Sequence, residues 1–424
     1  MATISRQGVP DHVRDDQIVD YDYFADRRVT SDPQLDIARL HGEAPDIFYT
    51  PRQGGFWVVT RYDLMSRILR DTDHFSNREL DIPKSNSDNV MIPLNLDPPE
   101  HLGYRMALMR HFDRKHIAAL EPKLRWWANH LIDAVIDKGG CEFTEQVGAG
   151  FPVSVFMELM GLPLDRFGQF RDIVREYFGP TTVERRITLQ NVIIGTMRDY
   201  FARRRAEPRD DLMSKLVREE VKGRPLTGEE LDSIGFLLFI AGLDTVANTL
   251  TFTWRFLAGQ PGLQERLAKD PGSTADFVEE ALRRFSIVQQ TRIVKKDHDF
   301  EGAAFREGDM IACPLALGGM DDRRNPEPRK FDMDRQDRAH VAFSTGPHTC
   351  VGNFLARAEM RVLTEEWIRR IPRFRIKPGT EPRWRMGGVM ALSNVHLEWP
   401  TDDSGWSGEA DIARIAPGRG GRDL

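Results

Sequence analysis

Hydrophobic residues recur at helical spacing through most of the chain, whereas alternating patterns are rare. Apolar positions three and four residues apart predict helices at 116–140, 153–162, 188–208 and 210–221. The first of these stretches ends in the pair Gly139 and Gly140, and Gly161 with Pro163 stops the second, as is typical of helix ends. The strand patterns lie at 54–61, 290–300, 309–317 and 394–399. The expected fold class is therefore mostly α with a minor β component.

The most apolar stretch, 234–254, is long enough to cross a bilayer and carries a single charge, Asp244. Asn248 and four threonines make it less hydrophobic, and polar residues flank it, so a long helix through a protein core is the better interpretation. A carboxylate inside such a helix is costly to bury. Asp244 and its neighbour Thr245 therefore need a functional reason.

Chain length, net charge and cysteine spacing limit the classes of protein to which this chain can belong. No linker divides the chain before residue 400, so we expect one domain over 1–400, followed by a mobile tail over 401–424 that is rich in Gly, Asp and Arg. A net charge of -6 gives no reason to expect nucleic acid. Three widely spaced cysteines and an N-terminus without a signal or anchor pattern predict a cytoplasmic protein with no membrane association.

Cys350 lies between a loop with Gly346 and Pro347 and the start of a helical pattern. Unpaired backbone N–H groups at a helix start favour a thiolate over a thiol. His348, two residues away, is a possible base for a thiol enzyme, although such partners are seldom adjacent in sequence. From the residues alone, Cys350 could be a nucleophile, a metal ligand or neither.

Three further stretches have ordinary structural interpretations when each is taken alone. His101 and Arg105 share a helix face after a Pro-Pro turn. Gly242 in the segment 241–246 could be a packing glycine. Glu280 and Arg283, one helical turn apart, could be a common ion pair.

Together, DPPEH (97–101) with Arg105, AGLDT (241–245), EALR (280–283) and FSTGPHTCVG (343–352) resemble the soluble bacterial cytochrome P450 monooxygenases. The resemblance extends from about residue 21 to 399. It is strongest to the camphor-hydroxylating branch and its terpenoid-oxidising relatives. It implies the cytochrome P450 fold, a large helical bundle around haem b with small sheets.

The resemblance also implies roles for individual residues. Cys350 would be the axial thiolate ligand of the haem iron, a ligand that favours O–O cleavage. Phe343 would shield the sulfur, Gly352 would let the helix lie against the porphyrin, and Glu280 and Arg283 would be a structural pair. Residues matching those that bind the haem propionates are His101, Arg105, Arg292 and His348.

Asp244 and Thr245 match the acid and alcohol pair that delivers protons to dioxygen in this family. The expected substrate pocket is apolar and suits a terpenoid or norisoprenoid. Camphor itself is not expected, because Asn89 or a neighbour stands where the camphor branch presents a tyrosine hydroxyl. The predicted pocket residues are Leu80, Asn89, Met91, Leu94, Leu237, Ile240 and Val288.

Several positions depart from the family pattern. Ser344 replaces the usual glycine in the cysteine loop, and Gln290 replaces an acidic residue near a propionate. The third arm of the Glu-Arg-Arg network is expected within 325–335, at Lys330 or Arg329.

The function implied is that of a monomeric haem-thiolate monooxygenase that uses O2 to hydroxylate a small hydrophobic substrate. Electrons would come from NAD(P)H through a flavoprotein reductase and a 2Fe-2S ferredoxin, which would dock at a basic patch with Arg105 and Arg357. One alternative is a haem-thiolate sensor that binds a ligand without turnover. The other is a thiol enzyme built on Cys350.

Overall fold

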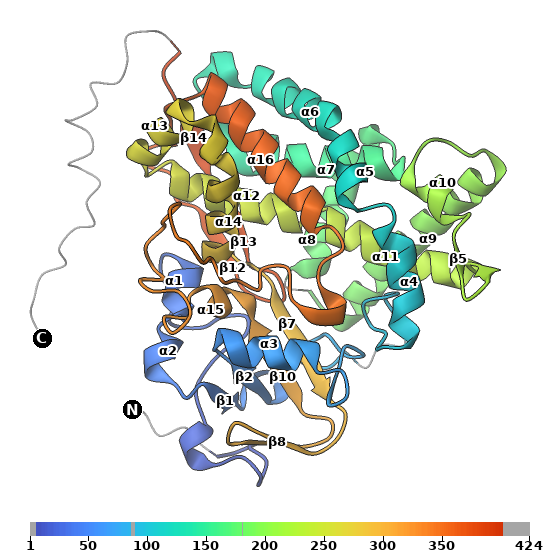
Figure 1. Cartoon of the computed structure of the whole chain (residues 1–424), viewed down its shortest axis with the longest axis vertical. Coiled ribbons are helices and arrows are strands. Elements are labelled where there is room, and N and C mark those ends of the chain that lie inside the picture. The colour runs from blue at the N-terminus through green and yellow to red at the C-terminus, as the bar shows by residue number, and fades with distance from the viewer. Residues whose placement is uncertain (1–5, 86–89, 180, 402–424) are drawn as a thin grey trace, which may run out of the picture.

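A computed structural model describes residues 6–85, 90–179 and 181–401 (Figure 1). The predicted tail from residue 402 onward and the predicted pocket residue Asn89 lie outside the described residues. Helices fill the upper part of the view in Figure 1, and the largest sheet lies at the lower end. The expected fold class, mostly α with a minor β component, is confirmed.

Sixteen α-helices lie in the described ranges. They are α1 (Pro33–Ile37), α2 (Leu40–Glu43), α3 (Tyr62–Arg70), α4 (Glu100–Met109), α5 (Arg114–Ala119), α6 (Glu121–Asp133), α7 (Gly150–Met160), α8 (Phe167–Phe178), α9 (Val183–Ala206), α10 (Leu212–Leu216), α11 (Gly228–Gly242), α12 (Thr245–Leu257), α13 (Pro261–Lys269), α14 (Thr274–Arg284), α15 (Leu315–Gly319) and α16 (Asn353–Arg370).

The strands form one five-stranded sheet and several smaller ones. The large sheet has the order β1 (Ile47–Thr50), β2 (Phe56–Val59), β10 (Met310–Pro314), β7 (Gln289–Val294) and β3 (Phe75–Ser76), antiparallel except between β2 and β10. The smaller sheets are β11 (Arg375–Ile376), β14 (His396–Glu398) and β4 (Gly140–Glu142), then β12 (Arg383–Arg385) with β13 (Ala391–Ser393), β5 (Glu220–Val221) with β6 (Arg224–Pro225), and β8 (His298–Phe300) with β9 (Ala303–Phe305).

Some predicted boundaries are wrong. The stretch 116–140 divides into α5 and α6, since Pro122 begins a new helix at its first turn. The helix predicted at 210–221 ends at Leu216, because Lys222 and Gly223 have positive φ angles and form the turn between β5 and β6. The strand predicted at 309–317 ends at Pro314, where α15 begins.

The predicted central helix is two helices, α11 and α12, with a break at Leu243 and Asp244. The Thr245 hydroxyl donates a hydrogen bond of 3.0 Å to the Ala241 carbonyl, which takes part in this local loosening. Gly242 is a packing glycine: a Cβ there would lie 2.5 Å from the Phe156 ring.

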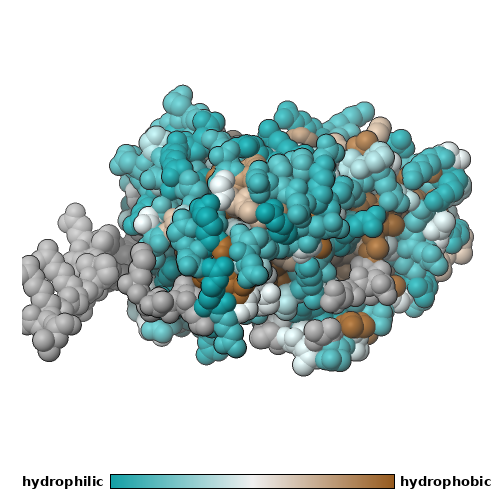
Figure 2. Space-filling view, turned by 90° about the horizontal axis from the view of Figure 1, so that it is seen from below, coloured by the Kyte–Doolittle hydropathy of each residue, from teal (hydrophilic) through white to brown (hydrophobic). Residues whose placement is uncertain are grey.

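The membrane-spanning interpretation also concerns this stretch. Among the described residues, only the run Gly228–Leu257 has the length and hydropathy to cross a membrane, and 72% of its most apolar window is buried inside the fold. This burial is typical of a core helix. Buried hydrophobic side chains form a cluster that extends from Val13 to Trp399, and the face in Figure 2 is mostly hydrophilic with small hydrophobic patches.

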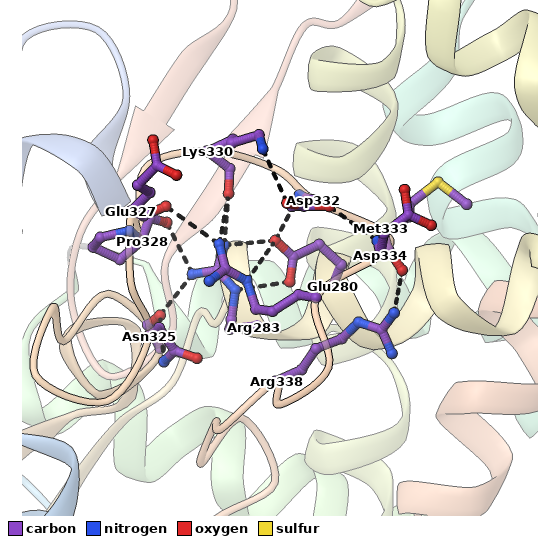
Figure 3. A network of polar contacts seen from close by, with 12 residues as sticks. Glu280, Arg283, Asn325, Glu327, Pro328, Lys330, Asp332, Met333, Asp334 and Arg338 are labelled. Carbon is purple, nitrogen blue, oxygen red and sulfur yellow. Dashed lines mark hydrogen bonds and ion pairs between the residues drawn. The ribbon is translucent and has the colours of Figure 1, made fainter.

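Glu280 and Arg283 on α14 are both completely buried (Figure 3). The guanidinium donates to both carboxylate oxygens, at 2.7 and 2.8 Å. Its remaining N–H groups donate to the backbone carbonyls of Gly319, Pro328 and Lys330. The pair thus fixes the segment that leads toward the Cys350 loop.

The third arm of this network is not where the sequence placed it. The side chain of Lys330 turns outward to Asp332, and only its backbone carbonyl contacts Arg283. Arg335, at the end of the predicted segment, forms the ion pair with Glu280 at 3.6 Å and is largely buried. The prediction of Lys330 or Arg329 is therefore wrong.

Candidate active site

The loop before α16 holds Cys350 at the helix entrance, as predicted. Its backbone N–H donates to the carbonyl of Phe343 at 2.8 Å, which closes the loop. Gly346 has φ of 75°, and a Cβ there would meet the backbone of Arg70 at 3.1 Å, so the turn requires glycine. α16 then begins at Asn353, after Gly352.

The sulfur of Cys350 faces an internal cavity of about 310 Å³. Burial raises the pKa of the thiol, whereas the Gly352 N–H, Arg105 and Arg357 lower it, and burial is the larger effect. The backbone at the helix entrance thus favours a thiolate, as expected, but burial outweighs this effect in the free thiol. A bound metal ion reverses this, because coordination deprotonates a thiol.

Most of the predicted site residues line this cavity. They are Leu94, His101, Arg105, Leu237, Thr245, Val288, Phe343, His348, Cys350 and Gly352. The walls between them are mainly apolar, from Leu282, Leu315 and Leu355 among others. A Cβ on Gly352 would meet only the Cys350 sulfur, at 3.9 Å, so this side of the cavity has room for a flat group.

Four predicted donors lie together at one end of the site. The rings of His101 and His348 are 4.4 Å apart between centroids, at 53° to each other. Burial, with Arg292, His101 and Arg105 close by, lowers the pKa of His348 to about 3. Burial and Arg105 lower the pKa of His101 to about 4. Burial also lowers the pKa of Arg292 to about 10.

Several nitrogens of this cluster are buried without a hydrogen-bond partner among the described residues. They are both ring nitrogens of His101, Nε2 of His348 and Nη2 of Arg292. Buried donors left in this way are costly. A group with two carboxylates would satisfy them and reverse the depressed pKa values, since opposite charges favour the protonated form of His and Arg.

Two of the departures from the family pattern, Ser344 and Gln290, contact each other. Ser344 has φ of 60°, a left-handed conformation that explains why glycine is usual there. Its hydroxyl donates to Oε1 of Gln290 at 2.9 Å. That oxygen lies 3.4 Å from Nη1 of Arg292. Ser344 and Gln290 therefore help to hold Arg292 at the cationic end of the site.

Asp244 is buried beside the cavity and does not line it. Its Oδ1 accepts a hydrogen bond of 2.6 Å from Nη1 of Arg171, and its Oδ2 accepts one of 2.8 Å from the Asn248 amide. Nη2 of Arg385 lies 3.9 Å from Oδ2. Thr245, the next residue, lines the cavity. Asp244 and Thr245 therefore connect the charged side chains around Asp244 with the cavity in front of the Cys350 sulfur.

Sequence reasoning missed Arg171, Asn248 and Arg385. Asn248 was detectable, because it lies one helical turn from Asp244. Arg171 and Arg385 come from α8 and β12, and no local pattern connects either segment with α12.

Three of the predicted pocket residues are not at this cavity. Leu80 and Met91 line a separate, larger cavity of about 1120 Å³, and Ile240 is buried in the core and lines neither cavity. Leu80 and Met91 thus lie at the larger cavity and not at the space before Cys350, whereas the assignment of Ile240 to a pocket is wrong. An apolar residue that points into the protein can line a cavity or pack against another side chain, and the sequence does not distinguish these two environments.

Comparison with known proteins identifies the family. The sequence profile described as Cytochrome P450 matches residues 142–271 and 273–395. The chain is 36% identical to "Probable cytochrome P450 127A1" of Sinorhizobium fredii, over 92% of this chain and 97% of that protein. The chain belongs to the cytochrome P450 family. It is also 29% identical to the "Steroid C26-monooxygenase" of Mycobacterium tuberculosis (strain CDC 1551 / Oshkosh), over 76% of this chain and 89% of that protein.

Solved structures agree with this membership. CYP101J2 superposes with a TM-score of 0.85 and 35% identity, covering 92% of this chain and 99% of that one. CYP101C1 has the same TM-score with 29% identity, over 92% of this chain and all of that one. The protein is thus a P450 monooxygenase of the bacterial type, and its cofactor is haem b. The thiol, the unpartnered donors and the open side at Gly352 fit that cofactor.

Proposed function

We propose that this chain hydroxylates a small hydrophobic substrate, a terpenoid or norisoprenoid, as a soluble, cytoplasmic, monomeric enzyme whose residues 1–400 act as one domain. The observation that carries the proposal is the cavity with the Cys350 thiol on one side, unpartnered donors at one end and Thr245 on its wall. Its mainly apolar lining suits a hydrophobic substrate. Bound haem supplies the activation of dioxygen and the oxidation of the C–H bond.

The residues around the cofactor have distinct tasks in this proposal. Cys350 would supply the thiolate that holds the haem iron, with Phe343 shielding the sulfur and Gly352 leaving room for the porphyrin. His101, Arg105, Arg292 and His348 bind the propionates, which accounts for their unpartnered nitrogens. Four donors from distant segments fix the orientation of the ring in its pocket.

Asp244 and Thr245 supply protons. Asp244 is held by Arg171 and Asn248, so a proton reaches it only when the ion pair with Arg171 opens toward solvent. The Thr245 hydroxyl donates to the Ala241 carbonyl and faces the cavity, where it can hold a water that passes the proton on.

The structure disfavours both alternatives. A thiol enzyme needs a base beside Cys350, yet burial and nearby cations lower the pKa of His348 to about 3, and burial raises the pKa of the thiol. A sensor without turnover has no use for a buried acid beside a hydroxyl that faces the reacting space.

The electron donor in this proposal is a 2Fe-2S ferredoxin served by a flavoprotein reductase and NAD(P)H. The basic patch predicted with Arg105 and Arg357 is revised, because Arg105 lines the cavity and Arg357 pairs with Glu279 at 3.1 Å. The start of α5 instead exposes Arg114 and Lys115. The adjoining helix α4 exposes an apolar face of Leu102, Met106 and Met109. The positive charges of α5 can attract an acidic protein partner, and the apolar face of α4 beside them can make the contact.

The proposal is tested first on the purified holoprotein. We expect the reduced, carbon monoxide-bound form to absorb at the haem-thiolate position. We also expect cineole or ionone-type compounds to shift the spin state of the iron, and NADH with a reconstituted ferredoxin chain to yield an oxidised product. A response to fatty acids or flat aromatics alone would contradict the substrate class. NADH consumption without any oxidised product would favour the sensor.

Replacing Thr245 with alanine should uncouple electron consumption from product formation. Without the hydroxyl, proton transfer loses a contribution of roughly 10²–10⁴ in rate, so reduced oxygen leaves as peroxide. We expect product per NADH to fall at least about tenfold while NADH consumption continues. Product, NADH and hydrogen peroxide are measured in the same assay.

Thr253→Ala is the matched control. Thr253 lies on the same helix, and its hydroxyl makes the same type of bond, to the Thr249 carbonyl at 2.7 Å, but it is fully buried away from the cavity. We expect this variant to couple electrons to product as the wild type does. Equal uncoupling in both variants would mean that Thr245 acts only through helix stability.

A further inference from the structure

The larger cavity, about 1120 Å³, adjoins the cavity before Cys350. Asn95 lines the larger one and Leu94 the smaller, and the same holds for Phe236 and Leu237 on α11. Neighbouring residues of the same two segments thus form walls of both spaces. The two spaces therefore lie next to each other, with these segments between them.

The lining of the larger cavity combines apolar side chains with charged ones. Phe24, Tyr177, Phe178, Phe236, Trp384 and Met386 provide apolar area. The charged residues of the lining are Arg78, Arg186, Arg385 and Lys84, together with the carboxylates Asp26, Glu79 and Asp81. Arg186 has a carboxylate among its electrostatic neighbours, that of Asp81. Arg385 has no such neighbour on the cavity wall.

Arg385 is a partly buried cation with few polar partners. Its side chain is 27% exposed, and its only ion pair among the described residues is the one with Asp244 at 3.9 Å. Its Nε is buried without a hydrogen-bond partner. Burial lowers the pKa of Arg385, and Arg171 and Arg175 lower it further, against the effect of Asp244. A guanidinium left like this costs free energy that an anionic ligand would recover.

Asp244 offsets the charge of Arg385 only in part, because its oxygens already have shorter partners. Arg171 takes Oδ1 at 2.6 Å and Asn248 takes Oδ2 at 2.8 Å. Arg171 and Arg175 in turn lie 3.9 and 3.5 Å from Glu145. Around Asp244, three guanidinium groups thus share two carboxylates. The excess positive charge faces the larger cavity through Arg385.

We propose that Arg385 binds the carboxylate of a terpenoid or norisoprenoid acid, and that acids of this kind are the substrate class of the enzyme. The hydrocarbon part lies along Trp384, Met386 and Phe236 and extends toward the Cys350 cavity. A planar guanidinium with free N–H groups matches the two oxygens of a carboxylate. This assignment rests on the proposed function, because it names the substrate of the same site.

The test uses the holoprotein and two probes of one skeleton, geranic acid and its primary amide geranamide. Binding is measured by calorimetry at neutral pH, where the acid is anionic, so that ligands bound away from the iron are also detected. We expect the acid to bind about tenfold or more tightly than the amide, since a hydrogen bond between two charged groups is stronger than one to a neutral amide. Arg385→Gln should abolish this preference and leave the affinity for the amide unchanged.

Arg383→Gln is the matched control, because Arg383 lies on the same strand, carries the same charge and is exposed outside the cavity. It should retain the full preference for the acid. Equal affinity of the wild type for both probes, no binding of either, or an equal loss of both in Arg385→Gln would overturn the inference. If the haem-thiolate spectrum is normal in those cases, the monooxygenase assignment stands. Loss of that spectrum would refute the assignment itself.

Discussion

Replacing Cys350 with alanine should abolish the haem-thiolate absorption band and reduce monooxygenase activity by more than about 100-fold. Changes to groups that merely support a metal ligand already cost 10–100-fold, and this change removes the ligand itself. No other cysteine can substitute, because Cys141 and Cys313 are buried outside the cavity. The reduced, carbon monoxide-bound spectrum and product formation are the measurements.

Two further variants make this result specific. Cys350→His should retain haem but absorb at the position typical of an imidazole ligand. Cys141→Ala removes a thiol from β4, away from the site, and should leave spectrum and turnover unchanged. Cys141 is a better control than Cys313, because Cys313 is an electrostatic neighbour of Arg292. A thiolate band that survives in Cys350→Ala would contradict the proposed ligand.

The sequence was most informative where the chemistry is local. The turn at Gly346, the helix start after Cys350 and the spacing of Glu280 and Arg283 each lie within a few residues, so pattern and resemblance were enough to place them. The hydrogen bond from the Thr245 hydroxyl to the Ala241 carbonyl is equally local, because it joins residues one helical turn apart. The gathering of His101, Arg105, Arg292 and His348 followed from the resemblance alone.

Where distant segments meet, the sequence was less informative. Arg171 and Arg385 contact Asp244 from α8 and β12, and nothing in their own surroundings indicates this. The break between α11 and α12 was missed because the apolar pattern continues through it. The third arm is Arg335 and not the predicted Lys330. The loop carries several Lys and Arg residues close together, and the sequence does not show which of them points toward Glu280.

Replacing Arg283 with alanine should lower the free energy of unfolding by about 3–5 kcal/mol, since it leaves the Glu280 carboxylate buried without its main partner. The change also removes donors from three backbone carbonyls that hold the segment 319–330. A domain has only about 5–15 kcal/mol of stability in total. We therefore expect little soluble holoprotein, measured as haem content per chain and by urea unfolding.

Arg283→Lys keeps this prediction testable if the alanine variant does not fold. It keeps the charge but loses the planar set of donors, so its urea midpoint should fall between those of the alanine variant and the wild type. The matched control is Arg266→Ala. Arg266 donates two hydrogen bonds to Asp334, at 2.6 and 2.7 Å, but both side chains are exposed, so its removal should change stability little. If Arg283→Ala and Arg266→Ala lowered the free energy of unfolding equally, burial would not be the reason that the Glu280–Arg283 pair is essential.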